Sequence, residues 1–194
     1  MINNRRIVFL YGALFLFWLL VFFVQRLIFL GYHNARFSSI EGLEILTSFY
    51  AGLRLDFSTA GYLMLVPFLT LFVRFFVSDA IFIKLLKGVL VVELVVLSVI
   101  HAAELSAYSE WGHKLSSRVF MHLLNPDEVL RTTGFSKGII SLVVIVVESV
   151  LTYFLLNRIF HWITRRSEDQ LKRSVFISLA FNVSGILVGL VISF

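Results

Sequence analysis

Four ionisable side chains lie inside stretches of this sequence that are otherwise strongly apolar. Glu93, His101 and Glu104 fall at helical spacing on one face of a run over residues 88–105, and Glu148 falls midway in a run over residues 139–156. A charge inside a lipid bilayer is costly, so each of these side chains requires a partner or a function. Their types allow a hydrogen-bonded cluster between helices, a binding site for a lipid or partner domain, or a proton relay.

A hydrogen-bonded cluster is the interpretation that this pattern favours. Metal-binding helical bundles use paired Glu-x-x-His motifs with further carboxylates, whereas this chain has one reversed pair, His101 and Glu104. We therefore expect no metal site. Glu148 could pair with a base or stay protonated, and it could share a proton with Glu93 if their two spans are neighbours. A proton relay would need a chain of such groups.

A second group of candidate residues lies at the expected ends of the apolar runs. Arg54 and Asp56 precede the second run. In the simplest interpretation, Arg54 extends toward lipid headgroups and Asp56 lies at a helix N-terminus. Alternatively, Arg54 holds an anionic lipid headgroup together with Lys114 or Arg118.

Aromatic side chains accompany these charges but do not indicate catalysis. Tyr108 and Trp111 have the character of interfacial aromatic residues. The sequence contains no phosphate-binding glycine loop, nucleophile elbow, H-E-x-x-H or zinc motif. No catalytic residue is predicted.

The composition defines the class of protein that must position these residues. The 194 residues are 59% hydrophobic and 15% charged, contain no cysteine and have a mean hydropathy of +0.92. These values exclude a soluble globular enzyme, a disordered chain and a disulfide scaffold. They predict an all-α, polytopic helical membrane protein. The net charge of +5 comes from basic residues between apolar runs, which indicates membrane topology rather than nucleic-acid binding.

Five apolar runs predict five transmembrane helices in a single membrane domain over residues 1–194. A short amphipathic helix over residues 38–54 is expected at the membrane surface, although this segment could instead extend the next span. An outer loop is expected over residues 106–137, with a helix start at the N-P-D-E sequence over residues 125–128. The predicted spans are residues 7–24, 57–73, 88–105, 139–156 and 175–194.

The distribution of basic residues predicts the orientation of these spans. With the N-terminus inside, the cytoplasmic segments hold ten Lys and Arg residues and the outer segments hold seven. The inner loops are also shorter, so their density of positive charge is higher. The positive-inside rule therefore favours a cytoplasmic N-terminus and an extracytoplasmic C-terminus.

Two stretches of the sequence carry family-like motifs. Residues 52–56 read G-L-R-L-D and lead into the second apolar run. Residues 102–115 read A-A-E-L-S-A-Y-S-E-W-G-H-K-L, and residues 120–128 read F-M-H-L-L-N-P-D-E. Together they resemble the N-terminal membrane domain of lipoteichoic acid synthase-like phosphoglycerol transferases, which belong to the sulfatase and alkaline phosphatase superfamily.

This resemblance implies a five-span anchor in a bacterial inner membrane, followed in the family by an extracytoplasmic catalytic domain. That domain would carry the Thr nucleophile and a divalent metal, Mn or Mg; no position of this chain matches a catalytic residue, and no cofactor is expected in it. The chain would be inactive alone, whether a fragment or a complete product. It would position a sulfatase-like domain near phosphatidylglycerol-type lipid. The implied binding or docking residues are Arg54, Asp56, Glu104, Tyr108, Trp111 and Lys114.

Two other functions stay open at this point. The acids Glu93 and Glu148, with the Pro67 interruption of the second run, would suit a small transporter or channel subunit, although the chain shows no inverted repeat. The G-x-x-x-G spacing of Gly185 and Gly189 would suit a structural membrane partner.

Overall fold

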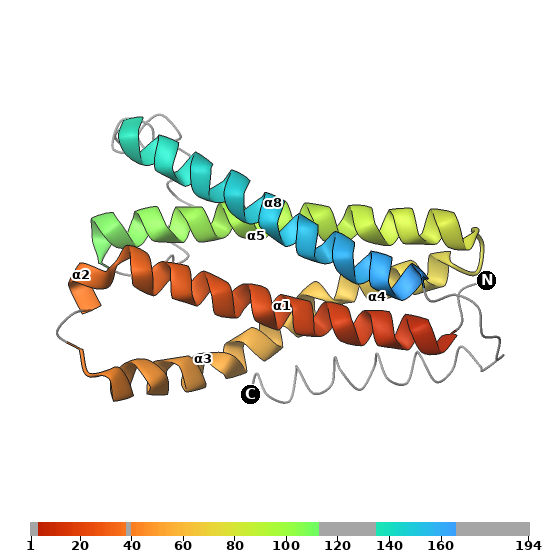
Figure 1. Cartoon of the computed structure of the whole chain (residues 1–194), viewed down its shortest axis with the longest axis horizontal. Coiled ribbons are helices and arrows are strands. Elements are labelled where there is room, and N and C mark those ends of the chain that lie inside the picture. Colours follow the sequence, from red (N-terminus) through yellow and green to blue (C-terminus); the bar gives the residue numbers. More distant parts are fainter. Residues whose placement is uncertain (1–3, 38–39, 113–134, 166–194) are drawn as a thin grey trace.

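The computed structural model describes residues 4–37, 40–112 and 135–165, and these residues form helices without any strand. Figure 1 shows them as an elongated bundle with its long axis along the helices. The all-α class expected from the composition is confirmed. The elements are α1 Asn4–Tyr32, α2 Asn34–Phe37, α3 Gly42–Leu63, α4 Leu65–Val73, α5 Asp79–Trp111 and α8 Phe135–Arg165.

The long segments alternate in direction along the bundle. At one end, the Arg74 guanidinium donates to Asn4 at the start of α1 and pairs with Asp79 at the start of α5, at 3.3 Å. At the opposite end, Arg36 of α2 donates to the carbonyl oxygens of Tyr108 and Ser109, at 3.0 and 2.8 Å. We call these the Arg74 end and the Tyr108 end. The segments therefore run up through α1, down through α3 and α4, and up again through α5.

Helix α8 completes the alternation by packing antiparallel to α5. The hydroxyls of Ser106 and Ser141 lie 2.8 Å apart near the Tyr108 end, and Lys87 donates to Asn157 nearer the Arg74 end. Residues late in α5 therefore lie beside residues early in α8, and the reverse holds at the other end. Among the described helices, contacts between these two are the most extensive.

One stripe of α1 supplies much of the core. Its buried residues recur at spacings of one and three, which places them along one face of a helix. Side chains off this stripe, such as Phe9 and Leu16, are largely exposed. The stripe packs with buried residues of α4, α5 and α8 in one cluster. Its members are Ile7, Leu10, Tyr11, Leu14, Phe17, Trp18, Val21 and Phe22.

Pro67 divides the predicted second span into two helices. Proline has no N–H to donate to the carbonyl four residues earlier, and its ring crowds that carbonyl, so the helix is interrupted at Met64. Across the bundle, the hydroxyl of Tyr11 donates to the Pro67 carbonyl oxygen at 2.8 Å and lies 3.2 Å from the hydroxyl of Thr70. These contacts fix the break against α1.

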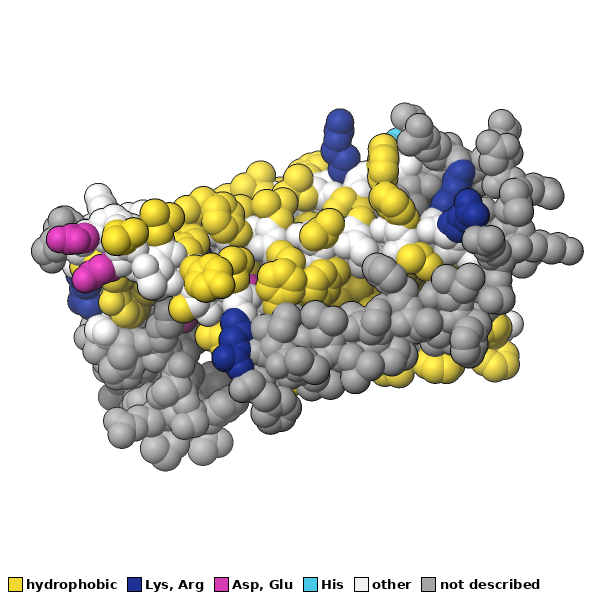
Figure 2. All heavy atoms as spheres, turned by 90° about the horizontal axis from the view of Figure 1, so that it is seen from below, with side chains coloured by type: hydrophobic (Ala, Val, Ile, Leu, Met, Phe, Trp, Pro, Cys, Tyr) yellow, Lys and Arg dark blue, Asp and Glu magenta, His cyan; other side chains and the backbone are white. Residues whose placement is uncertain are grey.

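Three helical stretches in the described part of the chain are long and apolar enough to cross a membrane: residues 4–32, 42–73 and 138–162. Large apolar side chains on their outward faces are exposed, as lipid contact requires. Figure 2 shows hydrophobic side chains spread along the described surface of one face, with acidic side chains gathered at one end. The predicted third span lies inside α5, and the predicted fifth, 175–194, lies outside the described residues, so the count of five stays a prediction.

Predicted boundaries differ from the structure at several places, and α8 begins at Phe135, inside the outer loop expected over residues 106–137. Residues 42–63 form one helix, so the expected surface helix is continuous with the second span, the alternative that the sequence left open. Residues 106–111 belong to α5 instead of a loop, because their polar groups find partners and the helix continues to Gly112, whose left-handed conformation ends it. The N-P-D-E sequence lies outside the described residues.

Candidate functional site: a polar cavity between α1, α3 and α5

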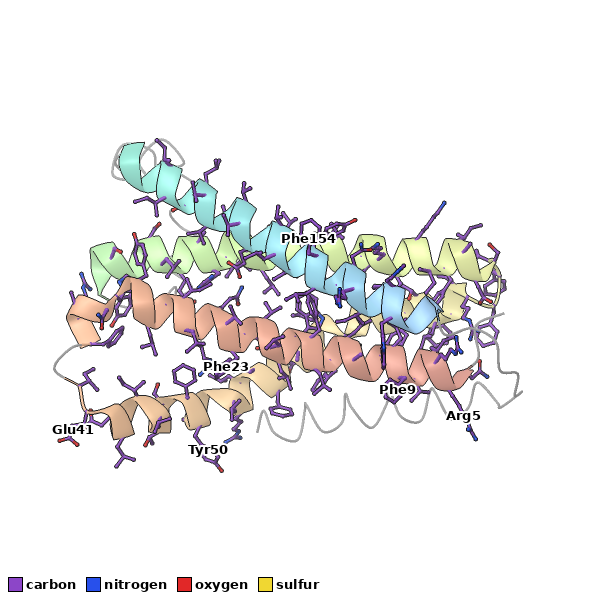
Figure 3. The ribbon with its side chains drawn as sticks, viewed as in Figure 1. Arg5, Phe9, Phe23, Glu41, Tyr50 and Phe154 are labelled. Carbon is purple, nitrogen blue, oxygen red and sulfur yellow. The ribbon has the colours of Figure 1, made fainter. Side chains whose placement is uncertain are left out.

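A cavity of about 490 Å³ lies between α1, α2, α3 and α5, toward the Tyr108 end. The first half of α3 diverges from α1 there, as Figure 1 shows. Phe23 of α1, labelled in Figure 3, meets Phe49 of α3 edge-on with ring centres 5.7 Å apart. We call this space the polar cavity because its lining includes Gln25, Arg26, Glu44, Ser48, Asp56, His101, Glu104 and Tyr108.

Arg26 and Asp56 form an ion pair on the wall of the polar cavity. Nη2 of Arg26 donates to Asp56 Oδ1 at 2.7 Å and to the carbonyl oxygen of Gly52 at 2.8 Å. The two side chains are 25% and 12% exposed, so the pair is largely removed from solvent. Gly52 makes room for it, since a Cβ at that position would lie 1.5 Å from Nη1 of Arg26. Asp56 is thus a mid-helix partner of Arg26 and not a helix N-terminal residue as expected.

His101 and Glu148 form a second polar contact beside the same cavity. Nδ1 of His101 lies 2.9 Å from Oε2 of Glu148, and both side chains are buried, at 5% and 7% exposure. The amide of Gln25 donates to the other carboxylate oxygen, so Glu148 joins α1, α5 and α8. His101 Nε2 is buried without a hydrogen-bond partner among the described residues. Of the residues in the expected cluster on α5, His101 makes this interhelical contact, and its partners are Glu148 of α8 and, through Glu148, Gln25 of α1.

The remaining predicted acids of α5 lie at different heights. Glu104 lines the polar cavity one turn from His101. Glu93 lies eight residues before His101, which is about 12 Å along a helix, and the hydrogen bonds of Glu148 go to Gln25 and His101. This geometry does not support the hypothesis that Glu93 and Glu148 share a proton. In the described part of the chain, no group of three His, Cys, Asp or Glu side chains could hold a metal ion.

The proposed docking residues are only partly brought together. Asp56, Glu104 and Tyr108 line the polar cavity. Arg54 is exposed on α3, the side chain of Trp111 is not described, and Lys114 lies outside the described residues. Gln25 and Arg26, which directly follow the predicted first span over residues 7–24, were not among the expected site residues.

An apolar groove lies on the other side of the His101–Glu148 contact. It has a volume of about 910 Å³ and runs between α1 and α8. Valine and leucine side chains line most of it, and Glu148 and Thr152 are polar exceptions in its middle. Toward the Arg74 end its lining includes Asn157, Arg158 and His161. We call it the α1–α8 groove.

An aromatic cluster surrounds His33 at the Tyr108 end. The His33 ring centre lies 4.8 Å from those of Phe29 and Tyr108, and the Arg36 guanidinium lies over the Tyr108 ring at 5.5 Å. His33 is buried between α1 and α2. This burial lowers the pKa of His33 below its ordinary value of 6.5, and the nearby positive charge of Arg36 lowers it further.

The lowered pKa of His33 predicts that acid destabilises the bundle. Below about pH 6.5, the unfolded chain binds a proton at this histidine that the folded chain resists, so the free energy of unfolding falls as the pH falls. Thermal unfolding in detergent between pH 7.5 and 5 checks this. His33→Phe should weaken the pH dependence, whereas His161→Phe, on an exposed histidine of α8, should not. Equal pH dependence in all three proteins would contradict the prediction.

The geometry thus offers two chemical features: an arginine and several carboxylates around a cavity, and a buried imidazole–carboxylate contact between that cavity and an apolar groove. Comparison with known protein families, curated proteins and solved structures finds no match to this chain.

Proposed function

We propose that this chain is a membrane-embedded anchor domain that binds a lipid headgroup in the polar cavity. The proposal includes the finer expectations from the sequence: five spans in a bacterial inner membrane, the Tyr108 end outward, and a sulfatase-like domain of the phosphoglycerol transferase type held above that end. The observation that carries it is the polar cavity itself, set among helices whose outward faces are apolar.

The lining of the polar cavity suits a phosphate that bears hydroxyl groups. Both bonds from Arg26 to α3 use Nη2, and a guanidinium has five N–H donors, so Arg26 retains donors for a phosphate oxygen. Carboxylates of Glu44 and Glu104 can accept hydrogen bonds from glycerol hydroxyls. A phosphatidylglycerol-type headgroup supplies both kinds of group.

The acyl chains of such a lipid would extend from the cavity toward the middle of the bundle, away from the Tyr108 end. Phe23 of α1 and Leu53 of α3 are exposed apolar side chains near the cavity, and Leu16 is exposed in the middle of α1. A lipid could therefore place its headgroup in the cavity and its chains along α1 and α3 without leaving the bilayer. This arrangement agrees with the sequence expectation for Asp56, Glu104 and Tyr108, and it replaces Arg54 with Arg26 as the phosphate-binding arginine.

Lipid retention in nanodiscs or by native mass spectrometry tests this proposal. The protein purified with mixed phosphatidylglycerol and phosphatidylethanolamine should retain phosphatidylglycerol preferentially. The double variant Arg26→Gln with Asp56→Asn removes both charges and keeps polar side chains, and we expect it to weaken retention about tenfold. Arg54→Gln, which removes an exposed positive charge two residues from Asp56, is the matched control and should retain lipid like the wild type.

Two results would contradict headgroup binding. The first is equal retention of both lipids by the wild-type protein. The second is a loss of phosphatidylglycerol with Arg54→Gln that equals the loss with the double variant, because this would indicate general surface charge rather than the polar cavity.

A further inference from the structure

One hydrogen bond lies between the polar cavity and the α1–α8 groove. His101 lines the polar cavity, Glu148 lines the α1–α8 groove, and Nδ1 of His101 lies 2.9 Å from Oε2 of Glu148. The polar cavity extends toward the Tyr108 end, and the groove reaches His161 toward the Arg74 end. A proton that crosses this single contact passes from one hollow to the other.

The unpartnered nitrogen of His101 points to a use for this contact. Leaving a buried donor or acceptor without a partner is costly, and Nε2 has none among the residues that the structure describes. An imidazole with one nitrogen on a carboxylate and the other beside a polar cavity can accept a proton at one nitrogen and release another from the opposite nitrogen. Because His101 lines the polar cavity, water in the cavity can reach this nitrogen.

We propose that His101 and Glu148 conduct protons between the polar cavity and the α1–α8 groove. A hydronium ion in the cavity gives a proton to Nε2, which leaves water and an imidazolium. The proton on Nδ1 then moves to the Glu148 carboxylate, so one N–H bond breaks and one O–H bond forms. Glu148 releases that proton to water that enters the groove from the Arg74 end, where Asn157, Arg158 and His161 line it. Reorientation of the imidazole ring restores the starting tautomer, and no oxidant or reductant is consumed.

Charged and polar side chains of α1, α3, α5 and α8 surround the His101–Glu148 contact. From α1, Gln25 holds the second carboxylate oxygen of Glu148. On the cavity side, Glu104 lies one turn from His101, and the Arg26–Asp56 pair stands on α1 and α3. On α5, Glu93 lies two turns before His101. On the groove side, α8 contributes Arg158 and His161, and the Thr152 hydroxyl donates to the Glu148 backbone carbonyl.

Proton flux into liposomes tests the proposal directly. The purified chain is reconstituted with a trapped pH-sensitive dye, and a valinomycin-driven potassium gradient supplies the driving force. We expect wild-type liposomes to acidify faster than protein-free liposomes. Glu148→Gln and His101→Gln keep a hydrogen-bonding side chain but cannot carry the proton, so each should slow the protein-dependent flux about tenfold or more. Glu41→Gln, on an exposed acid at the start of α3, is the control and should conduct like the wild type.

Helix content and elution volume are measured for every variant, so that loss of flux is separated from loss of folding. Glu148→Asp is a second variant, and it should retain part of the flux because it keeps a titrating carboxylate. The proposal is overturned if wild-type liposomes acidify no faster than empty ones, or if folded Glu148→Gln and His101→Gln conduct like the wild type. Neither result bears on headgroup binding, and Glu148→Gln is expected to retain lipid normally.

Discussion

Asp56→Ala is expected to lower the free energy of unfolding by about 2–3 kcal/mol, because it leaves the Arg26 guanidinium without its carboxylate in a largely buried position. Arg26 would keep its bond to the Gly52 carbonyl oxygen and its approach to the Phe49 ring, at 6.0 Å. These contacts do not neutralise its charge. Reversible unfolding in mixed detergent micelles, followed by circular dichroism, gives the measurement.

A double-mutant cycle identifies the pair as the cause of this loss. Arg26→Gln and Asp56→Asn should each destabilise the protein, and their combination should cost less than the sum, because the two charges are removed together. Gly52→Ala places a Cβ where the guanidinium lies, so it should reduce the coupling between Arg26 and Asp56 measured by the same cycle. Additive single effects, or a coupling that Gly52→Ala leaves unchanged, would contradict the assigned role of the pair.

Glu148→Ala is expected to cost about 2 kcal/mol or more, because it removes the partner of two other helices at once. The Gln25 amide and the His101 imidazole would both lose a buried acceptor. Glu148→Gln should cost less than about 1 kcal/mol, since its amide oxygen can still accept from Gln25 and its N–H can donate to the imidazole. The same unfolding experiment measures both variants.

The difference in unfolding free energy between Glu148→Ala and Glu148→Gln tests the role of Glu148. If Glu148→Gln unfolds as easily as Glu148→Ala, the negative charge of the carboxylate holds the helices together, and hydrogen bonding alone does not account for the contact. Ser149→Ala, at the neighbouring position of α8, is the matched control. Its hydroxyl has no hydrogen-bond partner among the described residues, so little stability should be lost.

The helical class and the alternation of spans were predictable because they depend on local composition. Runs of apolar residues with a helical period are sufficient to predict α1 and α8. The ends of these helices were not predictable in the same way. Ser106 and Ser109 read as loop residues, yet Ser106 pairs with Ser141 of α8 and Ser109 donates to the Leu105 carbonyl within the helix. Polar side chains extend a helix when such partners exist.

The candidate site was predictable only in part. Glu104 and His101 stood out because charges in an apolar run are costly, and their spacing placed them on one face. The partner of Asp56 is Arg26, thirty residues earlier, and no local pattern links the two. One signal was present: Gly52 and Asp56 are four residues apart, so a helix places both on the same side, where a long basic side chain can reach the glycine carbonyl and the carboxylate.

Site-directed cysteine labelling tests the membrane-embedded bundle most directly, because the chain has no native cysteine. Figure 3 places Glu41 at the end of the long axis opposite Arg5. Phe76 is 88% exposed beside Arg74, and Leu16 is an exposed apolar residue in the middle of α1. An impermeant maleimide should label Glu41→Cys from outside intact cells, Phe76→Cys only after the cells are opened, and Leu16→Cys in neither case. Labelling of Glu41→Cys and Phe76→Cys from the same side, or ready labelling of Leu16→Cys, would contradict the account.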